Sequence, residues 1–175
     1  MPEGNPLSIF APGLNALGVP WMAVGSIASS AYGERRSTLD LDVVALVGRQ
    51  DAARFLAAFP ETEFYCPPTE VIRAESARPE HGHFNLIHQN SIYKADIYVA
   101  TGSAFERWAF KNRRPLVVGE TPVWLAPPEY VIVAQAGVLL RRRQRKTSVR
   151  YSRRARGNRC GSRVFGKRDR AARPC

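Results

Sequence analysis

The chain has 175 residues and a formal net charge of +11, which is enough sequence for one domain with a buried core. It contains no run of about 18 apolar residues, so we expect no membrane-spanning helix and no membrane partner. The first residues lack the basic-then-apolar pattern of a secretion signal. Cys66, Cys160 and Cys175 are spaced too irregularly for a disulfide framework or a zinc site. We therefore expect a cytoplasmic protein.

The spacing of apolar residues predicts alternating helices and strands along the first 140 residues. Helices are expected at 7–17, 27–32, 51–59 and 103–111, with a further helix opening at Pro127-Pro128-Glu129. Asp51 is the predicted cap of the third helix. Strands are expected at 21–24, 41–47, 69–74, 83–88, 91–99, 116–118 and 121–125. The expected fold class is α/β (α+β): a small mixed, largely antiparallel sheet backed by helices.

The positive charge is concentrated at the end of the chain. Residues 1–140 carry 11 Lys and Arg against 14 Asp and Glu, whereas residues 141–175 carry 15 Lys and Arg against Asp169 alone. Residues 141–175 also have no apolar periodicity, so we expect a folded domain at 1–140 followed by a basic, disordered tail. Three explanations of that tail remain open: out-of-frame translation, a nonspecific nucleic-acid-binding segment, or a ribosomal-type binding extension.

Two aspartates separated by one residue, Asp40 and Asp42, precede the apolar run 43–47. Side chains two residues apart project from the same face of a strand, and two adjacent anions repel each other unless a cation lies between them. Carboxylate oxygens favour Mg²⁺ or Mn²⁺. Asp96 lies within another apolar strand, where an ionised carboxylate is costly unless it is paired or metal-bound; a structural hydrogen-bond acceptor is the alternative.

Gly25 and Ser26 follow a predicted strand and open a predicted helix. Free N–H groups at such a turn can bind phosphate, and the Ser26 hydroxyl can add a donor. Arg36, between this turn and the aspartates, is interpreted as a phosphate contact or a structural charge. Thr38 is either a nucleotide-binding residue or a residue of the strand entry.

The spacing Gly-Ser, six residues, Gly, two residues, Arg, then Thr, Asp and Asp at alternate positions resembles the signature of the DNA polymerase β-like nucleotidyltransferase superfamily. The matching positions are Gly25, Ser26, Gly33, Arg36, Thr38, Asp40 and Asp42, and Asp96 falls where the third carboxylate is expected. The resemblance covers roughly residues 5 to 135. It is greatest to small prokaryotic members: minimal nucleotidyltransferases, antibiotic adenylyltransferases and the abortive-infection toxin type.

This resemblance implies Mg²⁺-dependent transfer of a nucleotidyl group, AMP first of all, from a nucleoside triphosphate to an acceptor hydroxyl. Asp40 and Asp42 would hold two Mg²⁺ (or Mn²⁺), and Asp96 would complete the catalytic metal site. Gly25, Ser26, Arg36 and Thr38 would bind the nucleotide. The acceptor could be a small molecule, a tRNA end or a protein hydroxyl, and the toxin-type resemblance adds an antitoxin or toxin partner.

The stretch 128–134 resembles the Pro-Glu and apolar helix of the toxin-type group, but Gln135 stands where that group has a lysine. Back-translated and read one base later, residues 135–139 permit Lys-Leu-Glu-Tyr followed by Phe or Tyr. We therefore hypothesise a one-base insertion near codon 135, with residues 141–175 out of frame.

Two alternative functions follow from the same sequence. One is a catalytically impaired nucleotidyltransferase fold that acts as a binding or regulatory protein, and the other is a nucleic-acid binder acting through the basic tail. His81, His83 and His88 are interpreted as surface or hairpin histidines, because their spacing is not typical of zinc sites. Tyr98 is interpreted as an ordinary strand aromatic.

Overall fold

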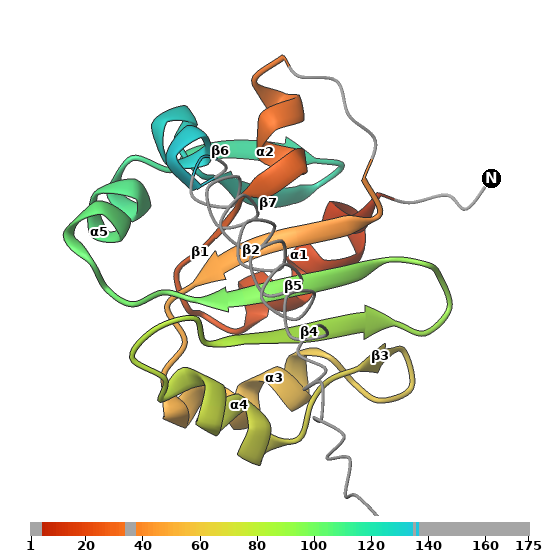
Figure 1. The fold of residues 1–175 in the computed structure, drawn as a ribbon. Coiled ribbons are helices and arrows are strands. Elements are labelled where there is room, and N and C mark those ends of the chain that lie inside the picture. The colour runs from red at the N-terminus through yellow and green to blue at the C-terminus, as the bar shows by residue number, and fades with distance from the viewer. Residues whose placement is uncertain (1–4, 34–37, 135, 137–175) are drawn as a thin grey trace, which may run out of the picture. The chain divides into compact units, whose positions relative to one another are not determined.

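A computed structural model describes residues 5–33, 38–134 and 136. They form a mixed α+β fold around one seven-stranded sheet (Figure 1). The helices are α1 (Pro6–Ala16), α2 (Gly25–Ala31), the 3₁₀ turn η1 (Arg49–Asp51), α3 (Ala52–Ala58), α4 (Thr69–Ser76), α5 (Ala104–Lys111) and an unlabelled helix at residues 128–134. The strands are β1 (Trp21–Ala23), β2 (Asp40–Ala45), β3 (Phe64–Tyr65), β4 (His83–His88), β5 (Lys94–Val99), β6 (Arg114–Val118) and β7 (Thr121–Leu125).

The strand order is β3-β4-β5-β2-β1-β7-β6. Four neighbouring pairs are antiparallel, and two pairs, β2 with β5 and β1 with β7, are parallel. The predicted fold class, a mixed and largely antiparallel sheet with helices, is therefore confirmed. The predicted boundary near residue 140, and the tail after it, lie outside the described residues.

The main core lies between one face of the sheet and helices α1 and α3. Figure 1 shows α1 behind the central strands. Its buried residues Leu7, Phe10 and Leu14 belong to the same core as Phe55 of α3 and Phe59, which follows that helix directly. The inward-facing strand residues that complete this core are Trp21, Ala23, Leu41, Val43, Ala45, Phe64, Phe84, Leu86, Ala95, Ile97, Val123 and Leu125. Every second residue of β2 thus belongs to the core, as the period of a strand requires.

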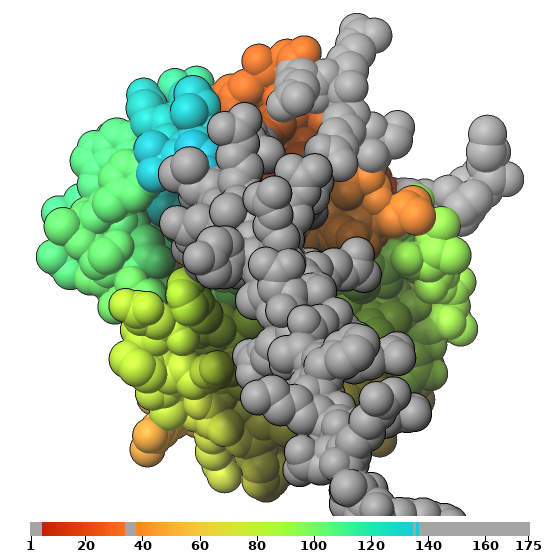
Figure 2. All heavy atoms as spheres, in the orientation of Figure 1, coloured from red at the N-terminus to blue at the C-terminus, as the bar shows by residue number. Residues whose placement is uncertain are grey.

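The opposite face of the sheet is covered only in part. Met22, Val24 and Val44 form a smaller cluster there with residues of α2, α5 and the helix at 128–134. Phe105 of α5 stacks on Tyr130 with ring centroids 5.2 Å apart, and Figure 2 shows α5 and the 128–134 helix meeting at the surface. The described helices on this face lie over β1 and β7. The side chains of Asp40 and Asp42, on β2, project from this same face of the sheet.

One prediction about local structure is wrong, and a second is correct in position only. Residues 69–74 were expected to form a strand but belong to α4, which follows Pro68, has Glu70 in its first turn and buries only Ile72. One apolar stripe suffices for a helix that packs on one side, and the pattern was too short to distinguish the two periods. Asp51 occupies the predicted N-cap position of α3, but its side chain makes no capping hydrogen bond there: its carboxylate accepts from the Gly48 N–H at 2.8 Å and pairs with Arg54 at 3.1 Å.

None of the helices in the described part of the chain has the length and apolar character that crossing a membrane requires.

The packing of α1 on α3 leads to a stability prediction. Phe10 is fully buried, with its ring 5.6 Å from that of Phe64 and 6.5 Å from that of Phe59. Phe10→Ala should lower the free energy of unfolding by about 3–5 kcal/mol, because it leaves a cavity among these rings. Urea unfolding measures this loss. Ile92→Ala, at a side chain that is 66% exposed, should change the same quantity by less than about 0.5 kcal/mol, and equal losses in both variants would contradict this packing.

Candidate functional site

The register of β2 against β5 brings the predicted carboxylates together. Asp42 is paired with Asp96, and Asp40 is paired with Lys94. Neighbouring strands lie about 4.8 Å apart and paired residues share a face, so the three carboxylates form one acidic cluster. The Asp96 side chain is only 13% exposed, whereas that of Asp40 is 46% exposed. The sequence prediction that these residues come together is met, while their roles remain predictions.

Lys94 lies inside this cluster. Its Nζ is 3.2 Å from Oδ2 of Asp96 and 3.5 Å from Oδ2 of Asp40. The hydrogen bond to Asp96, and then the charges of Asp96 and Asp40, raise the pKa of Lys94 despite the opposing effect of burial. Sequence reasoning missed this residue. The signal was the period of two on β5, which places Lys94, Asp96 and Tyr98 on one face.

The surroundings of Asp42 disfavour its charged form. Burial raises its pKa, and the nearby charges of Asp96 and Asp40 raise it further, while a hydrogen bond from Tyr98 and the charge of Lys94 oppose the shift. The Tyr98 hydroxyl donates to Oδ1 of Asp42 at 3.5 Å. Burial, together with Asp42, raises the pKa of Tyr98 to about 12, so this phenol remains a donor at neutral pH.

Gly25 lies directly against Asp42. The Val24 N–H donates to the Asp42 carbonyl at 2.8 Å, which holds the start of α2 beside β2. Gly25 has a φ of 61°, in the left-handed region, and a Cβ added to it would overlap the Asp42 carboxylate. Glycine is therefore required here twice, by conformation and by space. The turn predicted to bind phosphate thus adjoins the aspartates predicted to bind metal.

The remaining predicted nucleotide-binding residues have different surroundings. Ser26 is partly exposed in the first turn of α2. The Thr38 hydroxyl donates to the Asp40 carbonyl at 3.1 Å and accepts from the Asp40 N–H at 3.2 Å, which is the strand-entry role left open for it. Arg36 lies outside the described residues.

β4 adds two polar residues to the same face. His83 and Asn85 are the register partners of Tyr98 and Asp96. The Nε2 of His83 is 3.6 Å from Oδ1 of Asp96, and its ring lies 4.8 Å from that of Tyr98. The interpretation of His83 as a hairpin histidine is correct in location, but it missed the proximity to Asp96. The register of the predicted hairpin would have shown that proximity.

The donor chemistry of the cluster suits a hard cation, since Asp40, Asp42 and Asp96 offer only carboxylate oxygens. In the residues that the structure describes, no group of three or more His, Cys, Asp or Glu side chains is placed to hold a metal ion. An ammonium group lies between Asp40 and Asp96 instead. The residues therefore fit Mg²⁺ or Mn²⁺ in kind, and Lys94 marks one place where the cluster already accommodates a cation.

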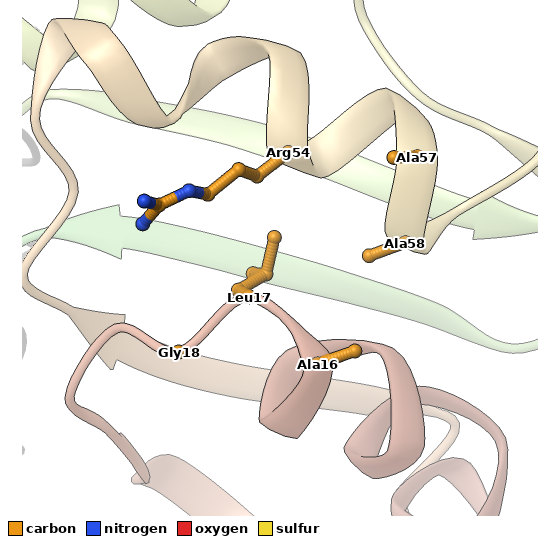
Figure 3. Close-up of a pocket in the computed structure, with 6 residues that line it drawn as sticks. All are labelled: Ala16, Leu17, Gly18, Arg54, Ala57 and Ala58. Atoms are coloured by element: carbon orange, nitrogen blue, oxygen red, sulfur yellow. The ribbon is translucent and has the colours of Figure 1, made fainter.

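A hollow among the described residues lies away from this cluster. It measures about 530 Å³ and is lined by Ala16, Leu17, Gly18, Arg54, Ala57 and Ala58 (Figure 3). These residues come from the end of α1 and from α3, which cover the other face of the sheet. Its one charged side chain, Arg54, is already paired with Asp51. This hollow offers no group suited to phosphate-transfer chemistry beyond that paired arginine.

Comparison with solved structures supports the fold. A candidate nucleotidyltransferase from Thermotoga maritima matches with a TM-score of 0.52 and 15% identity, over 85% of this chain and 91% of that chain. The chain shares the overall fold of that protein. A second candidate nucleotidyltransferase, from H. pylori, matches at 14% identity over 74% of this chain and 54% of that chain, with a TM-score of 0.41, too low to compare the folds. No protein-family model matches the sequence, and no curated protein matches it.

The contact between Gly25 and Asp42 can be tested with a matched glycine. Gly119 also has a φ of 61°, but a Cβ there meets nothing within 4 Å. Gly119→Ala should lower the free energy of unfolding by about 1–2 kcal/mol, which is the cost of the left-handed conformation alone. Gly25→Ala should lose about 1–3 kcal/mol more, because the methyl group must displace the Asp42 carboxylate. Urea unfolding of both variants measures the difference, and equal losses would show that Gly25 does not abut Asp42.

The raised pKa of Asp42 predicts that this residue lowers the stability of the fold in a pH-dependent way. A carboxyl group whose folded-state pKa is raised stabilises the fold at low pH, and this contribution is lost as the pH rises through the folded-state pKa. In the presence of a chelator, Asp42→Asn should therefore be more stable than the parent protein at neutral pH. The difference should disappear below the ordinary Asp value of 3.8. Denaturation at a series of pH values checks this; an Asn variant that is less stable at neutral pH would be the opposite result.

Proposed function

We propose that this protein is an Mg²⁺-dependent nucleotidyltransferase that moves a nucleotidyl group from a nucleoside triphosphate to an acceptor hydroxyl. The observation that supports this proposal most directly is that Asp42, which is in register with Asp96, also abuts the Gly25 turn. A phosphate-binding turn and an oxygen-ligand cluster on one face are what triphosphate chemistry needs. The fold that the chain shares with the candidate nucleotidyltransferase from Thermotoga maritima supports the same conclusion.

Each residue has a chemical role in this proposal. Asp40, Asp42 and Asp96 would hold Mg²⁺ or Mn²⁺, which when bound neutralises phosphate charge and makes an oxygen nucleophile more acidic. The free N–H groups of the Gly25-Ser26 turn and the Ser26 hydroxyl would donate to phosphate oxygens. Asp96, nearly buried and bordered by His83, would accept the proton of the acceptor hydroxyl.

The resemblance to adenylyltransferases makes AMP the group to test first. The acceptor carries a hydroxyl, and three classes are to be compared: a small molecule, a tRNA end and a protein side chain. The polar face beside β4, with His83 and Asn85 next to Asp96, is where that hydroxyl would approach. A toxin or antitoxin partner would supply the acceptor if the acceptor is a protein.

Label transfer tests the proposal. The full chain is incubated with ATP labelled at the α-phosphate, Mg²⁺ and each acceptor class in turn, and label in the acceptor is counted. The proposal expects Mg²⁺-dependent label in at least one class from the α-position and none from the γ-position. Transfer from the γ-position would indicate a kinase instead.

The carboxylates should be indispensable in this assay. Replacing both Asp40 and Asp42 with Asn should lower the rate by about a thousandfold or more, because the metal contribution is worth several kcal/mol. Glu120→Gln, in the turn between β6 and β7, is the matched control and should leave the rate within about twofold of the parent. Unchanged Mg²⁺-dependent transfer in the double variant would refute the assigned site.

A further inference from the structure

Lys94 occupies the position between two of the three carboxylates. Its ammonium group bridges Asp96 and Asp40 at 3.2 and 3.5 Å. It belongs to the same strand and face as Asp96, two residues away, and it is the register partner of Asp40. Because its stem is fixed to β5, the ammonium stays within reach of both carboxylates. A dissolved cation would compete for this position with a tethered one.

The charges of the site lead to the same interpretation. When all four groups are ionised, Asp40, Asp42 and Asp96 carry three negative charges and Lys94 carries one positive charge. The two charges that remain are those that a single divalent cation neutralises. Tyr98, the other titratable residue of β5 on this face, donates its hydroxyl hydrogen bond to Oδ1 of Asp42 at 3.5 Å. His83, from β4, faces Oδ1 of Asp96.

The geometry leaves a different position for that ion. Asp96 meets Lys94 through Oδ2, and Asp42 is its direct register partner on β2. Asp42 in turn abuts Gly25 at the turn proposed to bind phosphate. The place between Asp42 and Asp96 is therefore the one that adjoins the phosphate turn, and the place between Asp40 and Asp96 holds the lysine.

We propose that Lys94 serves as the second cation of this site, so that the chain binds one divalent ion, between Asp42 and Asp96, where a two-metal site binds two. The inference rests on the proposed function, because it takes the acidic cluster to be a metal site. It assigns Lys94 as the residue that sets metal stoichiometry. Removing the ammonium group should open the Asp40 side of the cluster to a second ion.

Binding of Mn²⁺ alone to the full chain tests this inference. Free Mn²⁺ is measured by electron paramagnetic resonance during titration at about pH 8. The parent protein should bind one Mn²⁺ per chain, and Lys94→Met should bind two. Lys94→Arg keeps the positive charge and should still bind one. Lys111→Met, in the last turn of α5, is the matched control for loss of a lysine and should also bind one.

The outcomes separate this inference from the proposed function. Two ions bound by the parent protein, or one ion bound by both the parent and Lys94→Met, would overturn the role of Lys94 and leave the metal site intact. No saturable binding by the parent or by Lys94→Met would contradict the metal site itself. Circular dichroism of each variant establishes that it is folded, so that a change in stoichiometry reports the site.

Discussion

The parallel pairing of β2 with β5 is the constraint on which the candidate site depends. These two strands are far apart in sequence, and their register places Asp42 beside Asp96 and Asp40 beside Lys94. The same register sends Leu41, Val43, Ala95 and Ile97 into the core. A slip of one residue would exchange the two faces, burying carboxylates and exposing apolar side chains. The burial of one face of these strands in the core therefore determines which charged side chains lie together on the other face.

The cost of bringing three carboxylates together is visible in the structure. The pKa of Asp42 is raised by burial and by its two acidic neighbours. A positive charge placed beside this carboxylate would therefore stabilise its ionised form. Lys94 relieves the Asp40 and Asp96 part of this repulsion. Gly25, which has no side chain, leaves the other side of Asp42 open to the turn of α2. A cluster of this kind lowers the stability of the fold, and the proposed metal binding would account for its presence.

Much of the fold could be predicted from the sequence, for identifiable reasons. The central strand at Asp40–Ala45 and the hairpin of β4 and β5 have clear apolar patterns, and Gly25 and the alternating aspartates have a recognisable spacing. The region at 69–74 was misassigned because a short amphipathic helix with one buried residue, Ile72, gives too few apolar positions to establish a period. Lys94 and His83 were missed because the period of two shows only which residues of a strand share a face, whereas their contacts with Asp40 and Asp96 depend on the register between strands.

The account is tested most directly by a crystal structure of the full chain with Mn²⁺ and a non-hydrolysable ATP analogue. Anomalous scattering locates the manganese independently of the protein atoms. The account predicts a manganese peak in contact with Asp42 and Asp96, and phosphate oxygens on the Gly25-Ser26 turn. Nucleotide and manganese bound together at another surface, with Asp42 and Asp96 contacting neither, would contradict it.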